Sequence, residues 1–293
     1  MNRTGIEYLD LTWNPIVMRC DRVSEGCKHC WHLEVSNRHA LNPRLSKNRR
    51  SASEGGTPVF LMHKLTEPIR RRAPSVVGVQ FMGDLFHSRI PRNWIESVLA
   101  AMAASYAMRK GHVFLVLTKR VGRMVPYATD QESCSRIHVI AADICARAGL
   151  VFPGLGPDWW PLPNVLWGVT VENRLRAEER IGELLRIPGR RWLSVEPMLG
   201  PVSLPSVVDG WGMPGTVEFV VAGCEKPARR HTETEWVRDL RDQCMAAGVR
   251  FFLKQMNDRH RGIVSLPELD GRRWSTKPSF VPEGFGDAVA KPW

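Results

Sequence analysis

Three cysteines near the start of the chain, Cys20, Cys27 and Cys30, have the spacing C-x6-C-x2-C. Three thiolates can hold three irons of a [4Fe–4S] cluster and leave the fourth iron open to another ligand. Three cysteines and one histidine also make a structural zinc site. The histidines available for it are His29, His32 and His39. A lone C-x2-C is weakly specific, so the bare spacing leaves a cluster, a zinc site and plain thiols open.

The other cysteines do not suggest disulfides. The chain has seven cysteines, an odd number, and four of them stand singly. These four are Cys134, Cys145, Cys224 and Cys244. The first residues lack the apolar run of a signal peptide, and the sequence has no 18-residue uncharged apolar stretch. We therefore expect a cytoplasmic protein without a membrane segment, in a reducing compartment where thiols serve as metal ligands.

The chain is strongly basic. Forty-one Lys and Arg against thirty Asp and Glu give a net charge of +11. Such a balance favours partners rich in phosphate, because each neutralised phosphate releases counterions. The dense runs Arg38 to Arg50 and Arg70 to Arg72 account for part of the excess. The alternative is a generally basic surface that keeps the protein soluble.

Short apolar runs alternate with longer amphipathic stretches, which is typical of βα units around a parallel sheet. The seven expected strands are 8–12, 76–82, 112–117, 165–170, 192–195, 217–222 and 250–253. The five expected helices are 27–39, 91–108, 136–148, 173–185 and 233–247. Segment 42–56 reads as an exposed loop. The cysteines follow the first strand, and ligands of parallel α/β folds bind outside the carboxyl ends of the strands.

Several segments in order along the chain resemble a family of conserved phage and prophage proteins whose pattern is similar to that of radical S-adenosylmethionine (SAM) enzymes. The matching segments are TWNP (12–15), SEGCKHCW (24–31), QFMGDLFHSRIP (80–91), LTKR (117–120), PNVLWGVTVEN (163–173), RRWLSVEPMLGPV (190–202), WVRDLRDQCMAAGVRFFLKQM (236–256) and DGRRW (270–274). The resemblance implies an α/β fold, a partial (β/α)6-type TIM barrel over residues 1–256. Residues 257–293 would form a C-terminal extension packed on it.

The resemblance also implies cofactors and a reaction. Cys20, Cys27 and Cys30 would hold a [4Fe–4S] cluster, and SAM would bind its open iron. One electron, drawn from an external flavodoxin-like donor, would cleave SAM to methionine and a 5′-deoxyadenosyl radical that removes a hydrogen from the substrate. The cofactor carries the difficult chemistry, while the protein sets the geometry.

In a fold of this kind, polar residues at the strand ends would contact SAM. These residues are Asp84, Thr118, Lys119, Thr170, Glu172, Ser194 and Glu196. Asp84 follows the second strand, where radical SAM proteins commonly bind the SAM ammonium, and a carboxylate suits that cation. The alternative for each residue is an ordinary salt bridge or helix cap. His87 reads as structural or substrate-facing.

Where the family resembles G-G-E-S after the sixth strand, this chain has Cys224 followed by Glu225. Cys224 can be a buried apolar residue or a fourth cluster ligand, and the first fits a lone cysteine better. Trp159, Trp160 and Trp211 can stack on a base or pack in a core or lid.

Phage-type ancestry and the basic charge point to DNA or a nucleotide as substrate, in the host cytoplasm. The most concrete hypothesis is an isomerase that rearranges an amino acid attached to a modified thymine in phage DNA, a step of DNA hypermodification. One alternative is a radical SAM lyase or repair enzyme acting on pyrimidine lesions. The other is a zinc-stabilised nucleic-acid-binding protein without catalytic activity.

Overall fold

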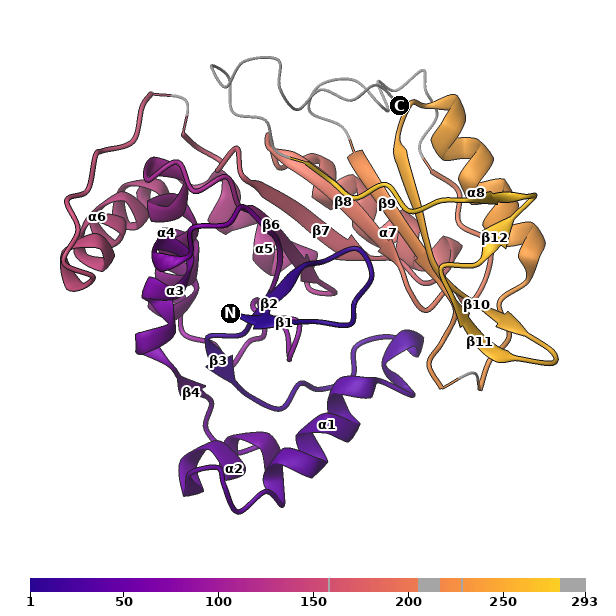
Figure 1. Cartoon of the computed structure of the whole chain (residues 1–293), viewed down its shortest axis with the longest axis horizontal. Coiled ribbons are helices and arrows are strands. Elements are labelled where there is room, and N and C mark those ends of the chain that lie inside the picture. The colour runs from indigo at the N-terminus through magenta and orange to yellow at the C-terminus, as the bar shows by residue number, and fades with distance from the viewer. Residues whose placement is uncertain (158, 205–216, 228, 280–293) are drawn as a thin grey trace.

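The computed structural model describes residues 1–157, 159–204, 217–227 and 229–279, which form an α/β fold around a nine-stranded, mostly parallel sheet (Figure 1). The strand order is β1-β2-β5-β6-β7-β8-β9-β10-β11. The parallel strands are β2 (Leu11–Trp13), β5 (Val76–Val79), β6 (Val113–Thr118), β7 (Val165–Thr170), β8 (Arg190–Val195), β9 (Val217–Gly223) and β10 (Arg250–Asp258). The antiparallel edge strands are β1 (Asn2–Arg3) and β11 (Gly262–Ser265). Each of the seven predicted strands overlaps one of these parallel strands, although β2 begins three residues later than predicted and β10 ends five residues later.

Helices cover one face of this sheet. They are α3 (Glu67–Arg70), α4 (Arg92–Ala107), α5 (Val121–Thr129), α6 (Gln131–Arg147), α7 (Arg174–Leu185) and α8 (Thr234–Ala246). Their apolar side chains and those of one sheet face form the larger of two buried clusters. Strand β7 is buried at every position, as expected of a parallel strand that is covered on both faces.

The second buried cluster lies on the other face and is filled from the N-terminal segment rather than from a helix. Tyr8 packs there against three rings of strands β8, β9 and β10, with ring centroids 5.7–6.3 Å away. Because Tyr8 precedes β2 by three residues, a flat sheet would hold β2 and β10 roughly 29 Å apart, at about 4.8 Å per strand. The sheet is therefore strongly curved, with Tyr8 on its concave side.

Between β2 and β5 the chain leaves the sheet and forms a small helical lobe, which lies below the sheet in Figure 1. It contains β3 (Ile16–Val17), η1 (Glu25–Cys27), α1 (Trp31–Ala40), α2 (Lys47–Glu54), β4 (Val59–Phe60) and η2 (Met62–Thr66). The prediction of a loop over 42–56 is wrong for α2. Ser46 caps this helix by accepting a hydrogen bond from the Arg49 N–H, and Ala52 is fully buried. The predicted helix 27–39 begins later than expected, at Trp31.

Residues 259–279 pack on the sheet. Strand β11 forms a hairpin with β10, and β12 (Glu268–Leu269) pairs with β13 (Arg272–Arg273). The predicted boundary after Met256 falls inside β10. No helix among the described residues has the length and apolarity needed to cross a membrane.

Candidate functional site

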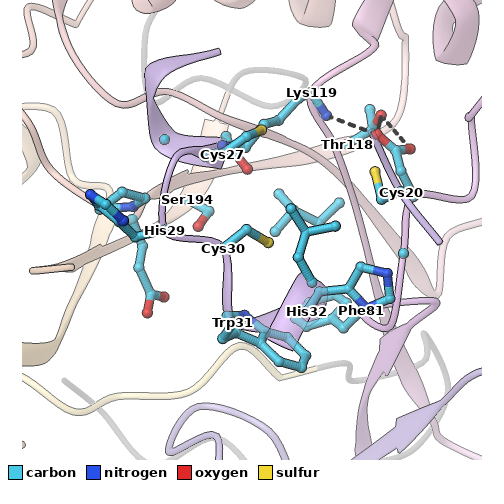
Figure 2. A pocket seen from close by; sticks show the side chains of 18 of the residues that line it. Cys20, Cys27, His29, Cys30, Trp31, His32, Phe81, Thr118, Lys119 and Ser194 are labelled. Atoms are coloured by element: carbon cyan, nitrogen blue, oxygen red, sulfur yellow. Dashed lines mark hydrogen bonds between the residues drawn. The ribbon is translucent and has the colours of Figure 1, made fainter. Parts of the chain in front are cut away.

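A cavity of about 190 Å³ opens at the carboxyl ends of the parallel strands, and all three predicted metal ligands line it. Figure 2 shows Cys20, Cys27 and Cys30 around this space. Cys20 follows β3, Cys27 ends η1, and Cys30 is the N-cap residue of α1. The fold thus gathers the three thiols at one site, which we call the cysteine cavity.

Six of the seven residues predicted to contact SAM also line the cysteine cavity. They are Asp84, Thr118, Lys119, Thr170, Ser194 and Glu196. These residues lie at or just after the ends of β5 to β8, where side chains of neighbouring parallel strands meet. The hydroxyls of Thr118, Thr170 and Ser194 are almost fully buried. The positions of these residues at strand ends therefore predicted correctly that they line one cavity.

Glu172, the seventh residue, lies behind the wall. It is fully buried, and its carboxylate accepts hydrogen bonds from Lys119 Nζ at 2.5 Å, from Arg180 Nη1 at 2.9 Å and from the Ser24 hydroxyl. Burial alone raises the pKa of Glu172, but Lys119 and Arg180 outweigh it and lower the pKa below its ordinary 4.5. Glu172 is thus an ionised anchor for residues 20–30, which carry the three cysteines and which we call the cysteine segment.

Glu25, which follows Ser24 in the chain, gives the cysteine segment a second anchor. Its two carboxylate oxygens accept from the Arg176 guanidinium at 2.9 and 3.0 Å, the two-point geometry that Arg favours. Arg230 donates to the Glu25 carbonyl at 3.1 Å. These contacts hold the turn that carries Cys27 against the sheet.

Asp21 anchors the end of the segment that carries Cys20. It accepts from His87 Nε2 at 2.7 Å and from the Arg120 guanidinium. His87 is buried, and its hydrogen bond to Asp21 is a structural contact. A structural role was one of the two expected for this residue. Arg120 reaches Asp84 at 2.8 Å and lies 3.7 Å from the Cys20 sulfur.

The environments of two thiols differ. Burial and the nearby Asp84 carboxylate raise the pKa of Cys20 to about 11, and Arg120 opposes them. Burial also acts to raise the pKa of Cys27, but Lys119 and hydrogen-bond donors of the turn lower it below its ordinary value. A positive charge thus acts on each thiol, but it outweighs burial only at Cys27.

Asp84 reaches the cavity but is already well paired. It accepts from the Thr118 hydroxyl at 2.8 Å, from the Phe86 N–H at 2.9 Å and from Arg120 at 2.8 Å. Two carboxylate oxygens have about four acceptor sites, so a ligand cation would share this group with Arg120.

The predicted zinc alternative needs four ligand atoms around one ion. With bonds of about 2.0–2.3 Å, tetrahedral ligand atoms lie roughly 3.5 Å apart. Among the described residues, the three-member ligand group within 4.8 Å is Cys20, Asp21 and His87, and it contains neither Cys27 nor Cys30. The three thiols are therefore spread more widely than one ion of this kind takes.

Several cavity residues were not predicted as site residues, and three of them bear on what the cavity can bind. Lys254 of β10 pairs with Glu196, and Trp31, 43% exposed, stands at the mouth. A single Lys inside the apolar run FFLKQM was the available signal for Lys254, and the position next to Cys30 was the signal for Trp31. The third is the buried Tyr8.

The remaining predicted residues have simpler surroundings. Cys224 lines the cavity but is fully buried, its backbone is hydrogen-bonded to Gln255, and burial raises its pKa to about 11. Trp159 and Trp160 pack against the helical layer, away from the cysteine cavity. Trp211 lies outside the described residues.

Residues 3–278 match the family described as "Protein of unknown function (DUF5131)". The chain belongs to the DUF5131 family. The match spans the three anchors of the cysteine segment and all the described residues that line the cavity. No curated protein and no solved structure matches this DUF5131 chain.

Proposed function

We propose that this DUF5131 protein is a radical SAM enzyme whose Cys20, Cys27 and Cys30 hold a [4Fe–4S] cluster. The observation that carries the proposal is the lining of one cavity by all three thiols and by polar residues from four consecutive strand ends. This is where parallel α/β folds bind their ligands.

The proposed architecture is a partial (β/α)6-type barrel with a C-terminal extension. Seven parallel strands in sequence order support it, as does the packing of Tyr8 against Phe252 across the concave face of the sheet. A partial barrel leaves its concave side accessible at the strand ends, where the cysteine cavity lies.

The donor set fits a cluster better than a single ion. In a cluster each thiolate binds a different iron, so the sulfur atoms need not converge on one point. The three sulfur atoms do not all lie within 4.8 Å of one another, which a cluster allows. Lys119 helps to lower the pKa of Cys27 and so favours its thiolate, and Arg120 acts in the same direction on Cys20, against burial and Asp84.

Bound here, the cluster and SAM would supply a one-electron cleavage that generates a 5′-deoxyadenosyl radical. The chain's own residues bind and orient. Asp84 and Glu196 suit the ammonium and ribose hydroxyls of SAM, and Lys119 suits its carboxylate. Tyr8, Phe81 and Leu117 line the same cavity and limit the access of water.

We further propose that the substrate is a modified thymine base in phage DNA, rearranged by an isomerase reaction in the host cytoplasm. The charge of +11 favours a polyanion. Trp31 is an exposed aromatic ring at the cavity mouth, where a base taken out of the duplex can stack.

The first test is iron and sulfide content with an absorption spectrum on anaerobically purified protein. We expect about four irons per chain, in line with a [4Fe–4S] cluster, and 5′-deoxyadenosine when SAM and a reductant are added. Cys27→Ala should lose iron, whereas Cys134→Ala, a buried cysteine of α6, should keep it. Stoichiometric zinc without iron would refute the radical reaction and favour the zinc-stabilised nucleic-acid-binding protein.

The proposal that DNA is the substrate has its own test. Affinity for duplex DNA should fall steeply as salt rises, because counterion release drives such binding. Salt-insensitive binding, or none, would exclude DNA as the partner. Incubation with irradiated DNA separates the isomerase from the lyase alternative, since only the lyase consumes pyrimidine lesions.

A further inference from the structure

A second cavity, of about 150 Å³, lies in the helical lobe next to the cysteine cavity. We call it the lobe cavity. Its polar lining residues are Asn2, Asn14, His32, Ser36, His39, Arg49, Ser53 and Lys64. The described residues that line it include two cations and no carboxylate. A cavity with this lining has a positive potential.

Within the part of the chain that the structure describes, neither cation has a counter-ion. The Nε atom of Arg49 is buried and has no hydrogen-bond partner among the described residues. The Lys64 ammonium likewise contacts no carboxylate or other acceptor among these residues. A buried charged donor left without an acceptor is costly, and structures normally pair it.

The surrounding sequence does not supply the missing negative charge. Residues 38–50 contain five Arg and Lys and no Asp or Glu. His39 lies in this field: burial first, then the charges of Arg49 and Arg38, lower its pKa. Arg38, Arg44 and Lys47 are exposed on the outside of the same segment. An anion is the ligand that this arrangement lacks.

We propose that the lobe cavity binds a phosphate group, with Arg49 and Lys64 as its charged ligands. Arg and Lys both bind phosphate, and an Asn amide or Ser hydroxyl in the lining can donate further hydrogen bonds. The phosphate comes either from a DNA backbone lying along segment 38–50 or from free phosphate. The site is independent of the proposed radical chemistry, since it uses none of the three cysteines.

Thermal unfolding with inorganic phosphate, against chloride at equal ionic strength, tests the site. We expect a saturable rise in Tm for the wild-type protein. In Arg49→Met and in Lys64→Met the apparent Kd should increase roughly tenfold or more, because each loses a charged hydrogen bond. Arg72→Met, an exposed and equally charged control, should bind phosphate like the wild type.

A second measurement distinguishes the two sources. If DNA supplies the phosphate, Arg49→Met weakens duplex binding more than Arg72→Met does, and inorganic phosphate competes with the duplex. If free phosphate is the ligand, Arg49→Met and Arg72→Met bind the duplex equally, while the phosphate-induced Tm shift is reduced only in Arg49→Met. Circular dichroism checks that each variant folds, and Lys64→Met replaces Arg49→Met should the latter unfold.

The proposal is overturned when phosphate gives no Tm rise beyond that of chloride, or when both Arg49→Met and Lys64→Met respond like the wild type. Neither measurement depends on iron, SAM or turnover. Failure of this site and failure of the proposed enzyme function therefore remain distinguishable.

Discussion

Gly26 lies so close to Glu172 that a β-carbon on Gly26 would stand 2.6 Å from the Glu172 Oε1 atom and 2.8 Å from Lys119 Nζ. The turn between Cys20 and Cys27 thus rests directly on the buried ion pair that follows β6 and β7. A side chain at position 26 would displace this ion pair or the turn, and the fit between turn and ion pair fixes where Cys27 stands.

Gly26→Ala should therefore push the turn away from Glu172. We expect a loss of roughly 1–3 kcal/mol in the free energy of unfolding, the usual cost of overpacking, together with reduced iron content. Urea unfolding and iron analysis measure the two effects. Gly122→Ala is the matched control: nothing lies within 4 Å of its β-carbon, and Gly122 is exposed in the first turn of α5, so the change in stability should stay within about 0.5 kcal/mol. Equal stability of the two variants would contradict the contact.

Glu172→Gln removes the negative charge from a buried group that binds Lys119 and Arg180. Leaving these cations with a neutral partner should cost roughly 3–5 kcal/mol of stability at pH 7. Because the folded-state pKa of Glu172 is lowered, its contribution is present above pH 4.5 and is lost as the pH falls through the folded-state value. The difference in unfolding free energy between wild type and variant should accordingly shrink below pH 4.5. A difference that stays constant down to pH 3 would refute the ionised anchor.

Tyr8→Ala tests the curvature of the sheet. Its ring contacts Trp192, Phe219 and Phe252, so removing it should cost roughly 3–5 kcal/mol, as for other buried aromatic residues. Tyr8→Phe should stay within about 0.5 kcal/mol of the wild type, because the described residues give its hydroxyl no hydrogen-bond partner. Thermal and urea unfolding measure both. A small effect of Tyr8→Ala would mean that the concave face does not depend on this ring.

His112 should make stability depend on pH in a different range. Burial lowers its pKa from 6.5 to about 4, so the imidazole is neutral in the folded protein at pH 7. Its folded-state pKa lies below the unfolded value, so stability is retained above pH 6.5 and falls by up to about 3 kcal/mol as the pH drops toward 4. His112→Leu should remove this part of the loss. Urea unfolding from pH 7 to pH 4.5 compares the two, and parallel curves would show that His112 does not contribute.

The sequence alone determined the elements and the general position of the site. Apolar runs such as 165–170 predict strands because a parallel strand is buried on both faces, and β7 has those bounds. The same alternation placed Cys20, Cys27 and Cys30 after the first strand, and residues such as Thr118 and Ser194 at strand ends. Parallel strands end together, so these positions predicted one cavity without knowledge of any distance.

Only the tertiary structure decided which of these residues face the cavity and which support it. Glu172 and Thr170 are two positions apart in sequence, yet one lies behind the wall and the other in it. The hydrogen bond that holds the Glu172 carboxylate behind the wall comes from the Ser24 hydroxyl, 148 positions away in the chain. Tyr8 on the concave face, helix α2 and the lobe cavity likewise depend on contacts between distant segments. Local periodicity records how a segment folds, but a buried ion pair or a cavity exists only once separate segments have packed.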